Sequence, residues 1–315
     1  MRSYIKDLKD KQKVDQKFLI FHVNRGVTNK GAPYLSFNLQ DKSGNIDAKY
    51  WSVKPEELDV YKEGMIIEAH GDILLYNNAL QLRIASLEIV DKKQENIMEY
   101  VKSSKVSEKE LKEEIYGIVD ELQDPVYKDI VETILLENEK EFFTYPAARS
   151  IHHDFVGGLA THVLYMLRMG KEICHLYPFL NQDLLLSAII LHDIGKLEEL
   201  SGPIITEYTL EGKLIGHISL MHAKVSETAI RLGYENDERV TLLRHMILSH
   251  HGEYEYGSPV LPQIPEAEIL SLVDNIDARM NVLDKALSQV EEGEFTPKLF
   301  SLENRYFYKA KKHEK

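Results

Sequence analysis

Hydrophobic positions in the first part of the chain gather in five short segments that are rich in β-branched and aromatic residues. Such segments predict β-strands. In chain order they read KFLIFHVNRGV, PYLSFNLQD, IDAKYWSV, MIIEAHGDILLY and LQLRIASLEIV. Turn-forming stretches separate them, among them Asn29-Lys30-Gly31, Lys42-Ser43-Gly44-Asn45 and Asn77-Asn78. The pattern predicts a five-stranded region over about residues 13–91.

From residue 107 onward the hydrophobic positions recur at three- and four-residue steps, which predicts helices. The helical segments read SEKELKEEIYGIVDELQD, PVYKDIVETILLENEKEFFTY, LATHVLYMLRMGKEICHLY, QDLLLSAIILHDIGKL, HAKVSETAIRLGY, ERVTLLRHMILSH and EAEILSLVDNIDARMNVLDKAL. Ser107 and Glu110 have the spacing of a capping box, and Pro125 suits the first turn of a helix. Residues 92–106 are polar and show neither pattern, so we interpret them as a connector.

These patterns predict two domains, which the length of 315 residues accommodates. Residues 1–91 are expected to form an all-β barrel of the OB type, because five strands in about 80 residues suit a small closed barrel. A small sandwich is the alternative. Residues 107–315 are expected to form an all-α domain.

Composition and charge limit the cellular location and the kinds of partner that we expect. The single cysteine, Cys174, excludes a disulfide framework within the chain and favours a cytoplasmic location. The polar start is unlike a signal peptide, and the longest apolar run is too short to span a membrane. The net charge of −13 argues against a broad surface that binds nucleic acid. Residues 1–91 carry no net charge, however, and are compatible with a narrow channel for a single nucleic-acid strand.

Seven histidine and aspartate residues recur at the ends or inner faces of the predicted helices. They are His162, His192, Asp193, His217, His250, His251 and Asp274. A single histidine on an apolar helix face is usually a satisfied core residue. Burying seven ionisable groups without partners would be costly, so bound metal ions are the expected partners. Imidazole and carboxylate together suit Mn²⁺, Co²⁺, Fe²⁺ or Zn²⁺.

The order of these residues resembles a known signature. The pattern H…HD…D at His162, His192-Asp193 and Asp274 is similar to that of the HD phosphohydrolase superfamily. The stretches PAARSIHHDFVGGLATH and HHGEYEYGSPVLPQIPEAEIL, with the barrel stretch GAPYLSFNLQDKSGNIDAKYWS, extend the resemblance to the YhaM family of 3′-to-5′ exoribonucleases over nearly the whole chain. The sequence departs from the cyclic-dinucleotide branch of the superfamily, since Gly252 follows the histidine pair and YGSP replaces GYP.

The resemblance implies two divalent metal ions, with Mn²⁺ as the first choice. One ion would be bound by His162, His192, Asp193 and Asp274, and the other by Asp193, His217, His250 and His251. A carboxylate can bridge two metals through its two oxygens, which suits Asp193. The family also implies that the barrel is a nucleic-acid-binding module.

Four further residues have two interpretations each. Lys196 lies four residues after His192 and would share its helix face if the helix continues, where it could hold a phosphate oxygen; the alternative is a solvated lysine past the end of a helix. The adjacent Gly195 suggests a close backbone approach. Asp277 either orients a ligand histidine or is merely exposed. His152 and His153 either contact the substrate strand or cap the following helix.

The barrel offers candidate contacts to nucleic acid. Aromatic side chains can stack on bases, and cations can follow the phosphate backbone. The candidates are Tyr34, Phe37, Trp51, Lys49 and Arg25, with Tyr50, Tyr76, Lys30, Lys54 and Arg83 as further possibilities. Strand alternation places Tyr50 and Trp51 on opposite faces, so at most one of them points outward.

The expected function is metal-dependent 3′-to-5′ exonucleolytic hydrolysis of single-stranded RNA, with single-stranded DNA as an alternative substrate and with release of nucleoside 5′-monophosphates. Asp193 would bridge two metals that share the attacking hydroxide, and Lys196 would stabilise the transition state. Two alternatives remain: a phosphodiesterase for cyclic dinucleotides or nucleotides, and a protein that binds single-stranded DNA or a replication site. No membrane partner is expected, and a homo-oligomer is possible.

Overall fold

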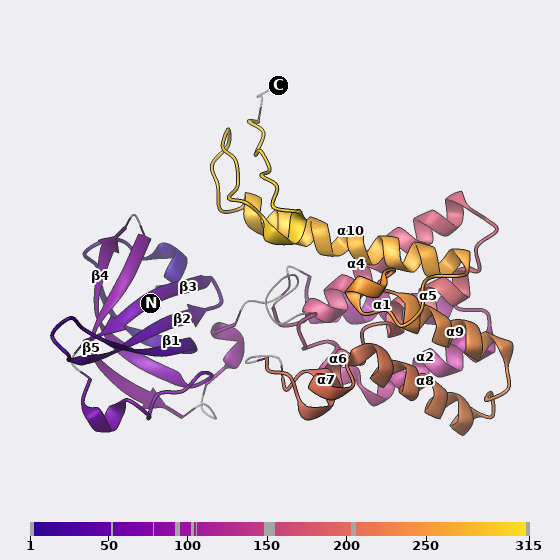
Figure 1. Ribbon diagram of the computed structural model, residues 1–315, viewed down its shortest axis with the longest axis horizontal. Helices are drawn as coiled ribbons and strands as arrows, with labels where there is room; N and C mark the ends of the chain where they lie inside the picture. Colours follow the sequence, from indigo (N-terminus) through magenta and orange to yellow (C-terminus); the bar gives the residue numbers. More distant parts are fainter. Residues whose placement is uncertain are drawn as a thin grey trace. The chain divides into compact units, whose positions relative to one another are not determined.

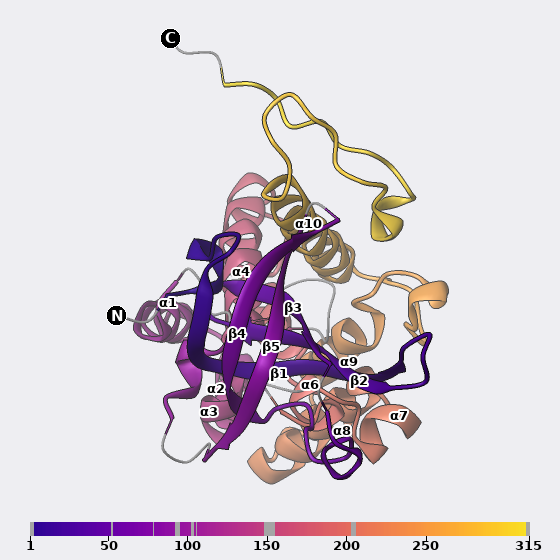
Figure 2. The same cartoon turned by 90° about the vertical axis from the view of Figure 1, so that its left-hand side faces the viewer.

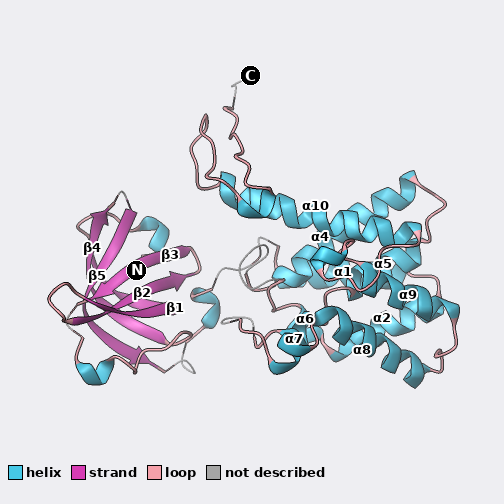
Figure 3. Cartoon of the chain, viewed as in Figure 1, coloured by secondary structure: helices cyan, strands magenta, loops and turns pink. Residues whose placement is uncertain are grey.

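The computed structural model describes residues 3–51, 53–77, 79–91, 95–101, 104, 106–147, 155–202 and 206–312. The chain forms two compact units, residues 1–103 and residues 104–315. Strands dominate the first unit, and helices dominate the second (Figure 3). The predicted two-part architecture, all-β followed by all-α, is confirmed.

The first unit is a closed five-stranded barrel (Figure 1). Its strands are β1 (Lys13–Val27), β2 (Pro33–Asp41), β3 (Gly44–Tyr50), β4 (Ile66–Tyr76) and β5 (Ala79–Val90). The strand order around the barrel is β1-β2-β3-β5-β4. The pairing of β3 with β5 is parallel, and the other pairings are antiparallel. The five predicted strands are all present, and closure leaves a barrel rather than a sandwich.

Alternation along β3 decides which barrel side chains face outward. Ile46, Ala48 and Tyr50 are buried in the barrel core, whereas Asp47 is exposed. The strand ends at Tyr50 rather than continuing into the following residues as the sequence pattern suggested. Trp51 stands immediately after it and is 48% exposed. The predicted opposition of Tyr50 and Trp51 is therefore confirmed.

The second unit is built from ten helices among its described residues. They are α1 (Glu108–Glu121), α2 (Pro125–Glu137), α3 (Glu139–Phe142), α4 (Gly158–Leu176), α5 (Gln182–Leu191), α6 (Lys196–Glu199), α7 (Leu210–Leu214), α8 (His217–Leu232), α9 (Glu238–Ser249) and α10 (Pro265–Leu287). The capping box of Ser107 and Glu110 is present at the start of α1, and Pro125 occupies the first turn of α2. None of the helices within the described ranges combines the length and apolarity needed to cross a bilayer.

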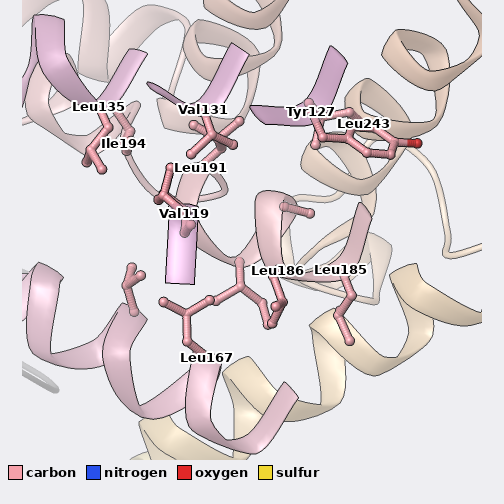
Figure 4. Packing of buried hydrophobic residues seen from close by; sticks show 14 of the residues in the cluster. Val119, Tyr127, Val131, Leu135, Leu167, Leu185, Leu186, Leu191, Ile194 and Leu243 are labelled. Atoms are coloured by element: carbon pink, nitrogen blue, oxygen red, sulfur yellow. The ribbon is translucent and has the colours of Figure 1, made fainter. Parts of the chain in front are cut away.

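Helix α5 is the central helix of the second unit. Every residue from Leu184 to Leu191 is buried, because α5 packs against α2, α4, α9 and α10. Leu185, Leu186 and Leu191 lie among side chains such as Leu167 and Leu243 from the surrounding helices (Figure 4). The continuous apolar run in the sequence is thus the sequence of a helix covered on all sides. The carboxyl end of α5 therefore lies in the interior of the second unit.

The prediction of one helix through residues 182–197 is wrong at its end. Helix α5 stops at Leu191, and the backbone tightens into turns in which the Ile194 and Lys196 amides donate to carbonyls three residues earlier. A β-carbon on Gly195 would lie 2.2 Å from the His217 carbonyl oxygen. The close approach inferred from this glycine is therefore a contact with the backbone at the start of α8.

Candidate metal centre

Seven side chains converge where α5 ends. They come from α4, the turn after α5, the first residue of α8, the end of α9 and the middle of α10, and are His162, His192, Asp193, His217, His250, His251 and Asp274. Potential ligand atoms of His162, His192 and Asp193 all lie within 4.8 Å of one another. Those of His217, His250 and His251 meet the same limit. Asp274 Oδ1 lies 3.3 Å from His162 Nε2. The structure brings all seven residues into one centre.

Asp193 stands between the two histidine groups. Its Oδ2 atom lies 3.4 Å from His192 Nε2 and 3.9 Å from His162 Nε2. Its Oδ1 atom lies 3.6 Å from His217 Nε2 and 3.8 Å from His250 Nε2. The side chain is only 2% exposed. Each oxygen of one buried carboxylate thus faces a different group of histidines.

Hydrogen bonds fix the tautomer of three of these imidazoles. The Nδ1 atoms of His192, His250 and His251 lie 2.7–2.8 Å from the backbone carbonyls of Ile189, Ile247 and Tyr256. Because a carbonyl can only accept, each Nδ1 carries the proton and donates it. A neutral imidazole then presents a lone pair at Nε2. In His192 and His250 that lone pair is directed toward Asp193.

This arrangement places hydrogen-bond acceptors opposite one another. Among the described residues, the Nε2 atoms of His192, His217 and His250 and the Oδ1 atom of Asp193 are buried and receive no hydrogen bond. Leaving buried acceptors unsatisfied costs about 1–3 kcal/mol each, and facing lone pairs repel. A cation between them removes both penalties. The donor set of imidazole nitrogens and carboxylate oxygens fits divalent transition metals.

Two carboxylates orient individual histidines from behind. Asp277 Oδ2 lies 2.6 Å from His162 Nδ1, and Glu199 Oε1 lies 3.1 Å from His217 Nδ1. Both carboxylates are mostly buried. Such contacts hold the ring and raise the basicity of the opposite nitrogen, as in the carboxylate–histidine pairs of metal sites. Asp277 is therefore buried against His162 rather than exposed.

Glu199 was missed from the sequence because it sits in the charged stretch Lys196–Glu199, which reads as a surface turn. The fold buries it beneath α7, where a β-carbon on Gly212 would lie 2.3 Å from the Glu199 carbonyl oxygen. The backbone amide of His217 also donates to Glu199 Oε1, at 3.2 Å. The glycine at 212 is the sequence signal that could have pointed to a buried neighbour.

Lys196 reaches the centre by a different route from the one expected. The residue begins α6 rather than continuing α5, so the predicted shared helix face is wrong. Its Nζ atom nevertheless lies 2.6 Å from Asp193 Oδ2, and its side chain is only 13% exposed. Burial lowers the pKa of Lys196, but the Asp193 carboxylate beside it leaves the pKa above its usual value. An ammonium ion thus stands at the oxygen that faces His192.

Burial and charge set the protonation states around this pair. Burial raises the pKa of Asp193, but the positive charge of Lys196 opposes it most strongly, and the pKa is held well below the usual range. Burial also lowers the pKa of His250 far below its ordinary value, which keeps the ring neutral. For His162, burial lowers the pKa, while hydrogen bonds to Asp274 and Asp277 raise it to about 9. The centre is therefore rich in ionised carboxylates.

The remaining histidine candidates separate clearly. His222 Nε2 accepts a hydrogen bond from Arg244 Nε at 3.0 Å, so it is engaged outside the cluster. His152 and His153 lie outside the described residues.

Three of the barrel candidates lie together on the surface, and the prediction for a fourth is wrong. Tyr34 and Trp51 pair with ring centroids 4.6 Å apart, and Lys49 Nζ lies 5.2 Å from the Tyr34 ring centre. Arg25 is exposed but forms an ion pair with Asp59. Phe37 was predicted to contact nucleic acid, and this is wrong. It is 1% exposed because strand alternation turns it into the barrel core.

Comparison with known proteins gives a consistent result for both units. Residues 159–279 match the HD domain family, and residues 20–90 match the family described as OB-fold nucleic acid binding domain. A domain of replication protein A from Methanococcus maripaludis is similar over 29% of this chain and 98% of its own, with a TM-score of 0.26 and 20% identity.

Two curated relatives match almost from end to end. The 3′-5′ exoribonuclease YhaM of Geobacillus sp. (strain WCH70) is 44% identical over 95% of this chain and 92% of its own length. The protein of the same name from Bacillus subtilis (strain 168) is 42% identical over 96% of both chains. Identity of this level extends over both units of the chain. The chain belongs to the YhaM family of 3′-to-5′ exoribonucleases.

Proposed function

We propose that this chain is a metal-dependent 3′-to-5′ exoribonuclease that hydrolyses single-stranded RNA and releases nucleoside 5′-monophosphates. Membership of the YhaM family supports the activity. One observation carries the metal dependence: the buried Nε2 atoms of His192, His217 and His250 lie 3.4–3.8 Å from the carboxylate oxygens of Asp193 and receive no hydrogen bond. Acceptors in that arrangement need a cation.

The two oxygens of Asp193 support a bridging role. On the Oδ2 side, we assign one divalent ion to His162, His192, Asp193 and Asp274. On the Oδ1 side, we assign a second to Asp193, His217, His250 and His251. Mn²⁺ is the first candidate, because a set of imidazoles and carboxylates without a thiolate suits it. Bound there, such ions would activate water and neutralise charge on the phosphoryl group.

The chain's own residues would order the reaction. Attack by the activated water forms a new oxygen–phosphorus bond and breaks the bond between phosphorus and the 3′-oxygen of the preceding nucleotide. The released nucleotide therefore keeps its 5′-phosphate. Lys196 is placed to exchange its contact with Asp193 for a non-bridging phosphate oxygen and to stabilise the charge that develops there. Asp277 and Glu199 would hold the rings of His162 and His217 during turnover.

The barrel would hold the strand upstream of the reacting end. Tyr34 and Trp51 offer exposed ring surface, and Lys49 adds a cation beside them. Stacking on such rings is worth about 1–3 kcal/mol per base and does not depend on base identity. We therefore assign non-specific strand affinity to the unit of residues 1–103 and chemistry to the unit of residues 104–315. Single-stranded DNA could occupy the same rings, since stacking does not require the 2′-hydroxyl.

The decisive experiment combines Asp193→Asn with a metal assay. The purified protein would be analysed for bound metals and tested on an end-labelled RNA ladder with Mn²⁺, Co²⁺, Fe²⁺, Zn²⁺ and Mg²⁺ in turn. We expect the wild type to shorten the RNA from its 3′ end. We expect the variant to retain fewer metal ions per chain and to lose at least about 1000-fold in rate, since charge stabilisation and water activation both depend on the bridge.

Asp183→Asn is the matched control, because Asp183 is a carboxylate in the same unit that accepts hydrogen bonds from the amides of Gln123 and Asp124. It should keep both the metal content and the rate of the wild type. If Asp193→Asn keeps its metals and trims RNA at the wild-type rate, the bridging role is wrong. Release of 3′-monophosphates would contradict the proposed direction of bond cleavage.

A further inference from the structure

The carboxy-terminal arm, residues 295–312, follows α10 and has no part in the proposed function so far. Figure 1 and Figure 2 both show it in yellow, following the end of α10 and projecting beyond the other helices of its unit. Its backbone is held by the bridges Phe295↔Tyr308 and Leu299↔Arg305. The Thr296 amide also donates to the Phe307 carbonyl at 2.9 Å. The arm is therefore a defined hairpin-like element.

Aromatic rings are concentrated and exposed on this arm. Five of its 18 residues are Phe or Tyr, whereas aromatic residues make up 9% of the whole chain. Phe295, Phe300, Tyr306 and Tyr308 are between 49% and 87% exposed. Single exposed apolar residues are normal on proteins, but several large rings on one element mark a binding surface.

The arm is also basic within an acidic chain. Residues 295–312 carry five basic residues and one acidic residue, a net charge of +4, while the whole chain carries −13. Glu291, Glu292 and Glu294 directly precede the arm, and Glu292 and Glu294 accept hydrogen bonds from the backbone amides of Lys312 and Lys309, so the net charge over residues 291–312 is +1. Within the part of the chain that the structure describes, Lys298, Lys309, Lys311 and Lys312 have no carboxylate at ion-pairing distance. Lys298 Nζ lies 5.7 Å from the centre of the Tyr306 ring, so cation and ring form a joint surface.

The tip of the arm is anchored to the helix that contributes to the metal centre. Glu303 Oε1 accepts from Arg279 Nη1 at 2.9 Å, and Arg279 lies on α10. Arg279 follows Asp274 by five residues, which is about 7.5 Å along a helix. Leu302, beside Glu303, is fully buried. The exposed rings are thus held on the same helix as a proposed metal ligand.

We propose that this arm binds single-stranded RNA, with its rings stacking on bases and its lysines contacting phosphates. The proposal deepens the proposed function, on which it rests for the identity of the strand. Alternating rings and cations are the composition that binds single strands without sequence preference. A second copy of the chain fits less well, because lysine is depleted from the cores of protein–protein interfaces. The helical unit would then bind the RNA through a surface of its own, in addition to the barrel.

The test uses the full-length metal-loaded protein and two paired variants of the arm. One removes rings, Phe300→Ser with Tyr306→Ser, and the other reverses charge, Lys298→Glu with Lys311→Glu. Matched controls change exposed residues elsewhere in the same unit: Tyr177→Ser with Phe179→Ser, an exposed ring pair, and Lys109→Glu with Lys140→Glu. The probe is a labelled single-stranded RNA of about 20 nucleotides whose 3′-terminal linkages are phosphorothioates, long enough for several stacked bases.

We expect each arm variant to raise the Kd for this RNA by about tenfold, and each control to stay within about twofold. The charge variant should also reduce the slope of log Kd against log salt, because fewer counterions are released. The turnover advantage of a 20-nucleotide substrate over a dinucleotide should shrink in the arm variants. Nucleotide release from the dinucleotide by the wild type tests the proposed function separately, since binding the resistant RNA requires no cleavage.

Two results would overturn the proposal. One is an RNA affinity of the arm variants equal to that of their controls. The other is a fall in molar mass of the arm variants, measured by light scattering, which would assign the arm to contacts between copies of the chain.

Discussion

The metal centre and the aromatic surface of the barrel serve the same proposed reaction but are built in opposite ways. At the centre, His192 and Asp193 are buried, and the Nε2 atom of His192 and the Oδ1 atom of Asp193 receive no hydrogen bond. On the barrel, Tyr34 and Trp51 are partly exposed and already contact each other. A buried polar group without a partner demands an explanation, whereas an exposed ring does not. The centre therefore constrains function far more tightly than the barrel surface.

A substitution of Lys196 tests this difference most strongly, because Lys196 provides the only ammonium that contacts the centre among the described residues. Lys196→Met should lower kcat by about 100- to 1000-fold, the usual cost of removing one group that stabilises transition-state charge. KM should change little. Lys196→Arg should recover part of the rate, because it restores the positive charge. Steady-state kinetics on a short RNA measures both, and metal analysis checks that the ions remain. A kcat within about threefold of the wild type for Lys196→Met would remove Lys196 from the chemistry.

A second experiment separates the two sides of the centre. Asp277→Asn loosens the support of His162, and Glu199→Gln loosens the support of His217. Each should weaken binding of one metal ion by about 10- to 100-fold and leave the other ion bound. Titration of the metal-free variants with Mn²⁺, followed by calorimetry, measures this. Simultaneous and equal weakening of both ions in both variants would contradict the assignment of one carboxylate to each side.

The smallest effects are expected on the barrel. Trp51→Ala and Tyr34→Ala should each raise KM for a long RNA by about tenfold, the value of one stacked base, with kcat unchanged. Tyr76→Ala is the control, since Tyr76 is exposed at the end of β4 and is not part of the ring pair. Measurements of kcat and KM on long and short RNA distinguish binding from chemistry. If Tyr76→Ala raises KM as much as Trp51→Ala does, the ring pair is not the strand surface.

Much of the fold could be predicted because its patterns are local. The five strands, the capping box of Ser107 and Glu110, and the apolar run of α5 follow from side-chain periodicity and turn chemistry. The break after Leu191 could not be predicted in this way. It depends on the backbone of His217 approaching Gly195, a contact between residues far apart in the chain. The short helix α7 and the carboxy-terminal arm lack a hydrophobic period and were missed for that reason.

The candidate site shows the same division. Histidines and aspartates embedded in apolar sequence were visible, because polar residues are conspicuous there. Glu199 was not, since its neighbours in the sequence are charged and its burial arises from packing against α7. Phe37 failed in the opposite direction, because an aromatic residue in a strand has the same letter whether it faces the core or solvent. Orientation is the information that sequence alone supplies poorly.

The contact between Gly195 and the His217 carbonyl links the two halves of the centre mechanically. Asp193 lies on the turn that ends at Gly195. His217 is the first residue of α8, and its backbone contacts that turn. Neither can shift without pushing the other, so the spacing between the two ligand groups is set by backbone rather than by flexible side chains. Any movement that widens the separation of the two ligand groups must therefore move an entire helix. The proposed metal site would then be preassembled at one spacing, which suits the successive identical cuts that we propose.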